Sequence, residues 1–128
     1  MSLLLDTHTF LWFISGDTQL SNRASALIED VNNDRFLSVA SLWEIAIKVN
    51  IGKLALTESF GTLIPRELQN NAVAILPVKL EHLAKLVELP LHHRDPFDRL
   101  IVVQALVEQM TVVSSDDKLD AYGLRREW

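Results

Sequence analysis

Short apolar runs alternate with helix-like patterns along the whole chain, and this alternation limits the folds open to it. The runs at residues 2–5, 35–39, 72–78 and 111–114 have the length and composition of buried strands. Between them, apolar residues recur every three or four positions, as on one face of a helix. Strands that alternate with helices favour a parallel sheet covered on both faces. We therefore predict a three-layer α/β/α sandwich with a mostly parallel sheet of about four strands.

Helices are predicted between these strands and after the last of them. They cover residues 10–14, 20–31, 41–49, 58–71, 80–89, 96–109 and 116–122, and an extended tail follows at 123–128. Gly61 and Pro65 weaken the fourth of these helices or divide it in two. Asp95-Pro96 is a strong start signal for the sixth, because Asp favours the N-cap and Pro the first helical position.

The composition fits one domain over residues 1–128, since 128 residues that are 48% hydrophobic can bury a substantial core. The absence of cysteine fits a reducing cytoplasm. We expect no signal peptide and no membrane span, because Asp6 follows directly on the first apolar run and no run approaches about 20 residues. The net charge of −5 argues against a broad basic surface for nucleic acid, although two bound divalent cations would nearly neutralise it.

Four acidic residues stand where an apolar run gives way to a helical pattern: Asp6, Glu44, Asp98 and Asp116. Loops that leave the carboxyl ends of parallel strands gather at one sheet edge, so these acids can converge. Two carboxylates about 6 Å apart at an effective dielectric of about 20 repel by roughly 3 kcal/mol, and four acids form six pairs. That total rivals the roughly 5 to 15 kcal/mol that keeps a domain folded. A shared site therefore predicts a divalent cation that prefers oxygen ligands, such as Mg²⁺.

Each acid also has a purely structural interpretation. Asp6 and Asp116 can cap the helices that follow them, and Asp98 in a first turn favours the helix dipole. Ser41-Leu42-Trp43-Glu44 fits a capping box. Capping does not require the four acids to meet, whereas a shared site does.

The histidines carry a weaker signal. His92 and His93 are adjacent and His82 stands alone, so none has the spacing of a helical zinc site, and we interpret them as surface or loop residues. His8 is a candidate substrate contact because it is close to Asp6 in the chain.

Four blocks carry a resemblance to a known family. They are Leu4-Leu5-Asp6-Thr7-His8 with Leu11-Trp12, Ser41-Leu42-Trp43-Glu44-Ile45, Arg94-Asp95-Pro96-Phe97-Asp98-Arg99, and Ser114-Ser115-Asp116. These blocks resemble a PIN domain of the VapC toxin type, over essentially the whole chain, and the D-P-F-D-R block is the most specific of them.

The resemblance implies a metal-dependent endoribonuclease that hydrolyses RNA phosphodiesters with Mg²⁺ or Mn²⁺. The four acids match the family's acidic positions. Toxins of this type are held inactive by a cognate antitoxin and commonly form dimers, so the resemblance implies an antitoxin protein and a homodimer as partners.

Roles follow for the site residues. Asp6 and Asp98 are expected as central ligands, Asp116 and Glu44 as ligands directly or through water, Asp95, Thr7 and Ser114 as supporting residues, and Arg99 or Arg94 as a phosphate contact. Asp117 stands beside Asp116, and the Ser-Asp position favours Asp116 as the residue that faces the site.

Two alternatives remain open. A receiver-like phosphoacceptor signalling module has a similar length and layout, but it needs paired acids after the first strand, and here Thr7 and His8 follow Asp6. Its candidate lysine, Lys79, has no clear partner in the sequence. A non-catalytic protein-binding domain would use the acids only as helix caps.

Overall fold

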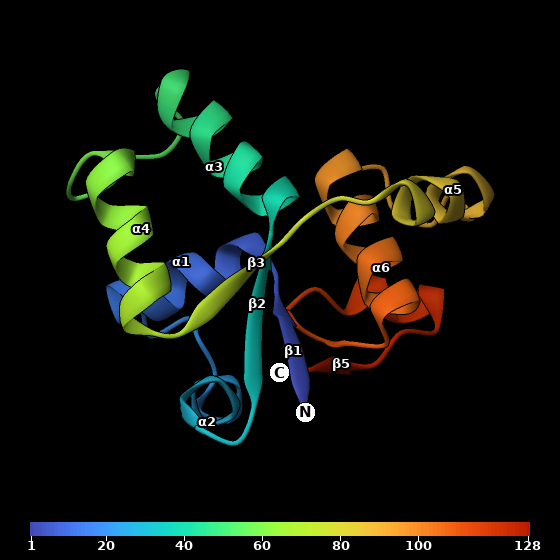
Figure 1. Ribbon diagram of the computed structural model, residues 1–128, viewed down its shortest axis with the longest axis horizontal. Helices are drawn as coiled ribbons and strands as arrows, with labels where there is room; N and C mark the ends of the chain where they lie inside the picture. The colour runs from blue at the N-terminus through green and yellow to red at the C-terminus, as the bar shows by residue number, and fades with distance from the viewer.

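A parallel five-stranded sheet forms the centre of the molecule in the computed structural model, which describes all 128 residues (Figure 1). The strand order is β3-β2-β1-β4-β5, and every neighbouring pair is parallel. The strands are β1 (Ser2–Leu5), β2 (Asp34–Ser38), β3 (Val73–Leu76), β4 (Thr111–Val113) and β5 (Arg126–Glu127). The predicted α/β class with a parallel sheet is confirmed. One strand more than expected is present, because part of the predicted tail pairs with β4.

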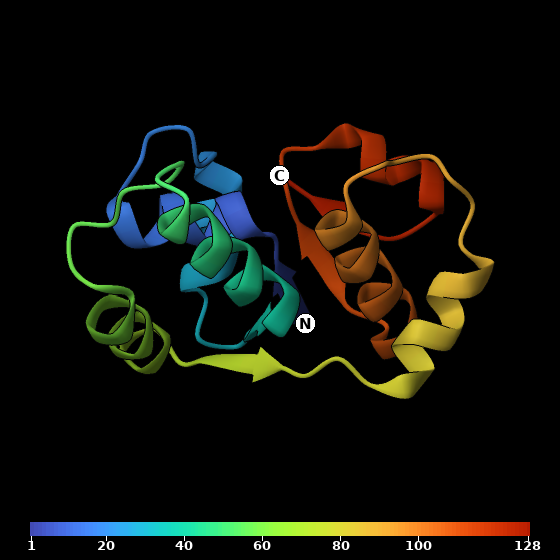
Figure 2. The same ribbon diagram turned by 90° about the horizontal axis from the view of Figure 1, so that it is seen from above.

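The helices lie between consecutive strands, as the sequence pattern predicts. They are α1 (Thr7–Ser15), α2 (Asn22–Glu29), α3 (Val39–Asn50), α4 (Phe60–Asn70), α5 (Leu80–Glu88), α6 (Pro96–Glu108) and the 3-10 helix η1 (Asp117–Tyr122). None of them is both long and apolar enough to cross a membrane. Figure 2 shows α1 to α4 at one side of the molecule and α5, α6 and the C-terminal segment at the other.

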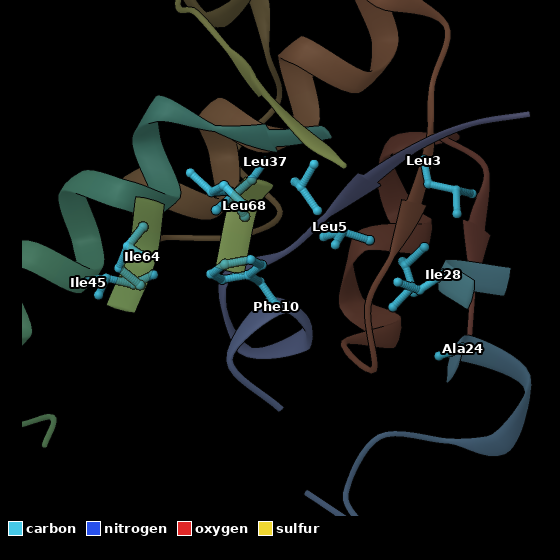
Figure 3. Close-up of a cluster of buried hydrophobic side chains, with 11 residues drawn as sticks. Leu3, Leu5, Phe10, Ala24, Ile28, Leu37, Ile45, Ile64 and Leu68 are labelled. Atoms are coloured by element: carbon cyan, nitrogen blue, oxygen red, sulfur yellow. The ribbon is translucent and has the colours of Figure 1, made fainter. Parts of the chain in front are cut away.

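Two hydrophobic cores fill the two sides of the sheet. Leu3 and Leu5 belong to the larger core and Leu4 to the other, because successive side chains of a strand point to opposite faces. Figure 3 shows the larger core, in which Phe10 of α1 and Ile45 of α3 pack with residues of β1 and β2. All five of these side chains are fully buried, so β1 is covered on both faces.

The start of α3 differs from the prediction, and α4 shows what Pro65 does to a helix. The helix predicted to begin at Ser41 begins at Val39, because the Ser38 hydroxyl accepts a hydrogen bond from the Ala40 N–H at 3.0 Å and caps it. The capping-box interpretation of Glu44 is therefore wrong. Helix α4 runs unbroken through Pro65, which costs one backbone hydrogen bond but leaves the apolar face of the helix packed in the core.

The topology predicts that a ligand would bind beside β1. The chain passes from β1 to β2 on one side and reaches β4 on the other, so the sheet order reverses between β1 and β4. Ligands of open α/β sheets bind outside the carboxyl ends of the strands at such a point. Asp6 follows β1 directly, and Asp116 comes shortly after β4.

Candidate metal centre

Asp6 and Asp116 each cap a helix with one carboxylate oxygen, which leaves the other oxygen available for a second interaction. One Asp6 oxygen accepts the Thr9 N–H at 2.8 Å, and one Asp116 oxygen accepts the Lys118 N–H at 3.1 Å. The Ser114 hydroxyl accepts the Asp116 N–H at 3.1 Å and so orients the turn after β4. The capping interpretation is correct for both acids, and it does not compete with a second role.

Asp98 reaches the same edge of the sheet from the first turn of α6. One oxygen of Asp95 accepts the N–H groups of Phe97 and Asp98 at 2.8 and 3.1 Å, so the predicted N-cap is confirmed. The His93 Nε2 lies 3.4 Å from an Asp98 oxygen and 3.0 Å from an Asp116 oxygen. His93 therefore joins two acids that are 18 positions apart in the chain.

The tautomer of His93 follows from its other ring nitrogen. Its Nδ1 accepts the Asp95 N–H at 3.1 Å, so Nδ1 carries no proton. A neutral ring then has its proton on Nε2, which points at Asp98 and Asp116 as a hydrogen-bond donor. This makes His93 a residue that orients two carboxylates, and leaves the oxygens as the ligands for a cation.

The pKa of Asp98 is raised from 3.8 to about 7. Burial is the largest cause, followed by the negative charge of Asp95, while His93 acts in the opposite direction. The charges of Asp6 and Glu44 also raise it, which shows that both acids lie close enough to act on Asp98. Asp98 is therefore the acid at this edge whose negative charge is disfavoured by burial and by its acidic neighbours.

Glu44 lies in the second turn of α3 and is buried, with 4% of its surface exposed. The Thr7 hydroxyl donates to one of its oxygens at 2.7 Å, and the Lys48 ammonium contacts the other at 2.6 Å. Ser41, the helix cap expected from the sequence, is buried and lies 3.0 Å from the Thr7 hydroxyl. Glu44 therefore has the partners that a buried carboxylate needs.

The donor set fits a hard divalent cation. The ligand atoms of His93, Asp98 and Asp116 all lie within 4.8 Å of one another, whereas Asp6 and Glu44 are coupled to this group through charge. Because the anionic donors are carboxylate oxygens and no thiolate is available, Mg²⁺ or Mn²⁺ suits the site better than a soft metal. The partly exposed side chains of Asp98 and Asp116 leave the site open to solvent.

Arg99 uses its donors within the protein. Its guanidinium donates to the carbonyl oxygens of Leu89, Pro90 and His93 at 3.0 to 3.3 Å, and contacts the Tyr122 hydroxyl at 3.4 Å. This geometry holds the loop that carries His93 and does not support the expected phosphate contact at Arg99. Arg94, the other candidate, is exposed.

Replacing Arg99 by alanine should lower the free energy of unfolding by about 1 to 3 kcal/mol, because several loop carbonyls lose their donor. Arg99→Lys should recover part of this loss, since an ammonium reaches fewer of these acceptors. Thermal unfolding followed by circular dichroism measures both changes. A substrate contact would instead raise KM and leave the melting temperature unchanged, which would return Arg99 to its predicted role.

The structure also places His82, Lys79 and Asp117, three residues that the sequence left in question. The sequence predicts His82 at the surface, but it is fully buried, with Nδ1 accepting the Lys79 N–H and Nε2 lying 3.2 Å from Glu108. Lys79 also contacts Glu108, at 3.3 Å, so it is engaged by α6 and gives no support to the receiver-like alternative. Asp117 is exposed in η1, whereas Asp116 contacts His93, as the Ser-Asp position favours.

Sequence reasoning missed His93 and Lys48 as parts of this site. His93 does not have the sequence spacing of a metal ligand. The one signal that could have pointed to it is its position two residues before Asp95, the cap residue of the helix that carries Asp98. Lys48 stands four residues after Glu44, the spacing at which helical side chains form ion pairs. Neither signal is specific until the fold places these residues beside the acids.

Comparisons with known proteins agree with the architecture. Solved structures with a similar fold include VapBC2 from Rickettsia felis bound to a DNA fragment from their promoter, with a TM-score of 0.75 and 19% identity over 99% of this chain and 98% of that one. VapBC-5 from Mycobacterium tuberculosis, a member of the VapBC family of toxin-antitoxin systems, gives a TM-score of 0.60 and 21% identity over 98% and 95%. At these identities the likeness shows the fold alone.

The sequence comparisons show the family. The chain is 36% identical over 63 residues to Ribonuclease VapC16 of Mycobacterium tuberculosis, a match that spans 49% of this chain and less than half, 45%, of that protein. The model of the PIN domain family matches residues 3–124. This match covers every acid of the site and confirms the resemblance carried by the D-P-F-D-R block. The chain belongs to the PIN domain family.

Proposed function

We propose that this chain is a metal-dependent endoribonuclease that hydrolyses RNA phosphodiesters and acts as the toxin of a toxin–antitoxin pair. The observation that carries the proposal is the approach of Asp98 and Asp116 on His93, with the pKa of Asp98 raised to about 7 by burial and by the neighbouring acids Asp95, Asp6 and Glu44. A cluster of this kind is stabilised by a divalent cation. Family membership and the ribonuclease name of the VapC16 relative support the same reaction.

Asp6, Asp98 and Asp116 would hold Mg²⁺ or Mn²⁺, with Glu44 bound directly or through water. Such an ion, when bound, polarises a phosphoryl oxygen and lowers the pKa of water for phosphodiester hydrolysis. The chain's own residues fix the carboxylates. Thr7 holds Glu44, and His93 donates toward Asp98 and Asp116.

Further residues orient the acids from behind and contact the substrate. Asp95 and Ser114 fix the backbone of Asp98 and Asp116, because each accepts a hydrogen bond from the N–H of the acid that it supports. Arg94 is exposed on the same loop as His93 and would contact the RNA phosphates. No protein nucleophile is required.

The partners form part of the proposal. An antitoxin protein is suggested by the VapBC systems to which the fold is similar. An apolar cavity of about 520 Å³ between α1 and the α3–α4 connection is lined by Leu11, Trp12, Leu54 and Leu56 among others, and would receive such a protein. We further propose a homodimer, a single domain over residues 1–128 and a cytoplasmic location, the last in keeping with a chain that has no cysteine.

The purified protein should cut single-stranded or structured RNA when Mg²⁺ or Mn²⁺ is present, because the cation completes the acid cluster. EDTA should stop the cutting, and added Mg²⁺ in excess should restore it. Gel analysis of a labelled RNA measures all three conditions. Cutting that continues undiminished in EDTA would contradict the proposed chemistry.

A further inference from the structure

The end of α3 brings two lysines together beside the acid cluster. The helix closes in a Schellman turn, in which Gly52 at φ +76° donates its N–H to the Val49 carbonyl at 3.2 Å and Lys53 donates to the Lys48 carbonyl at 2.9 Å. Gly52 is suited to this backbone conformation because it has no Cβ. In such turns the residues at the positions of Lys48 and Lys53 are frequently apolar and in contact with each other. Here both positions are lysines.

A cavity of about 310 Å³ lies between this turn and α1. Its polar lining comes from Thr7, His8, Lys48 and Lys53, and no acidic side chain lines it. Two ammonium groups and an imidazole thus surround one small space. The Lys48 ammonium is paired with Glu44, whereas the Lys53 ammonium has no carboxylate among the lining residues and can attract an anion.

The cavity adjoins the metal centre through two contacts. Thr7, which lines the cavity, donates to Glu44, and Lys48 contacts the other oxygen of the same carboxylate. The Glu44 side chain therefore separates a region that attracts cations from one that attracts anions. An RNA strand whose phosphate is held at the acids would carry a neighbouring phosphate to the cationic side.

We propose that this lysine cavity binds a backbone phosphate of the RNA strand next to the phosphate that is cut. The proposal rests on the proposed function and adds a subsite to it. Lys53 is exposed and makes the phosphate contact, while Lys48 serves both the phosphate and Glu44. A lysine ammonium binds phosphate as a compact point charge.

Lys53→Gln tests the subsite, with Lys85→Gln as its matched control. Lys85 is also exposed, but it lies on α5, at the opposite side of the molecule from α1 in both views (Figure 1, Figure 2). Both changes are placed in the cleavage-deficient Asp98→Asn protein, and binding of a short labelled single-stranded RNA of mixed sequence is measured over a range of salt. Lys53→Gln should weaken binding about fivefold or more at low salt and reduce the slope of log K against log salt by about 0.7, the value for one phosphate contact on a single strand. Lys85→Gln should change neither.

Each alternative outcome is distinct. Equal RNA binding by the two glutamine variants, with wild-type protein still cutting RNA, would overturn the subsite and leave the proposed function intact. Failure of wild-type protein to cut RNA with Mg²⁺ would overturn the function itself. A titration with inorganic phosphate, followed through the amide NMR signals of Gly52 and Lys53, tests whether the cavity binds a free phosphate ion. Its result is compared with the effect of Lys53→Gln on RNA binding. A phosphate-induced change in these signals without any Lys53 effect on RNA binding would assign the cavity to a small anion and contradict the proposal.

Discussion

Asp98→Asn should reduce RNA cleavage by about 10³-fold or more, because the variant removes a charged ligand from the cation that stabilises the transition state. Asp98 is the acid on which the charges of Asp6, Glu44 and Asp95 converge, so its loss affects the centre of the site. An asparagine has nearly the same shape, and the first turn of α6 keeps its Asp95 cap. Single-turnover cleavage with saturating Mg²⁺ measures the effect on the chemical step.

Asp117→Asn is the matched control for this variant. Asp117 is also an aspartate near a helix start, but it is exposed in η1 and makes no contact with His93. It should retain the wild-type cleavage rate. Full activity of Asp98→Asn, together with a normal fold, would instead favour the alternative in which the acids serve only as helix caps.

The metal-free protein should lose about 2 kcal/mol of stability as the pH rises from about 4 to about 7, an effect that comes from Asp98. Its pKa is 3.8 in the unfolded chain and about 7 in the fold, so the folded state binds more protons between these values. Stability then falls as pH rises through this window and is not lost further above pH 7. A tenfold difference in proton affinity between the folded and unfolded states corresponds to about 1.4 kcal/mol. We expect about half of the free energy that the whole pKa difference would give, because the Asp98 side chain is partly exposed and solvent screens its charge.

Urea unfolding in EDTA at several pH values measures this loss. Asp98→Asn should remove most of the pH dependence and be more stable than wild type at pH 7. Mg²⁺ should raise the stability of wild type, by about 2.7 kcal/mol at a concentration 100 times Kd, and should have much less effect on the variant. The contrary result would be a metal-free wild type that, relative to Asp98→Asn, loses no stability between pH 4 and pH 7. That result would show that the acids are not crowded.

Local sequence was a good guide to the elements of this fold. The apolar run of β1 and the Asp95-Pro96 start of α6 were both predicted, since burial on two faces and N-terminal capping act within a few residues. Strand β5 was not predicted, because two residues have no periodicity of their own and form a strand only by pairing with β4. The predicted start of α3 was wrong by two positions, since Ser38 and Ser41 are equally good caps until the end of β2 is fixed.

The same division applies to the site. Asp6, Asp98 and Asp116 could be found as acids at the ends of strands and starts of helices. His93 could not, since its value depends on Asp98 and Asp116 lying on either side of its Nε2. The buried position of His82 depends likewise on α5 packing against α6, where Glu108 meets it.

The sequence by itself determined the alternation of strands and helices and the family through its D-P-F-D-R block, and it supplied the acids that we propose as ligands of a cation. Only the tertiary structure decided which groups face those acids: His93 from a loop and Lys48 from the next turn of α3. The physical reason is one of range. Hydrophobic periodicity and capping act between neighbours in the chain, whereas charge and hydrogen bonding act between neighbours in space, and the crossover of the parallel sheet creates those neighbours.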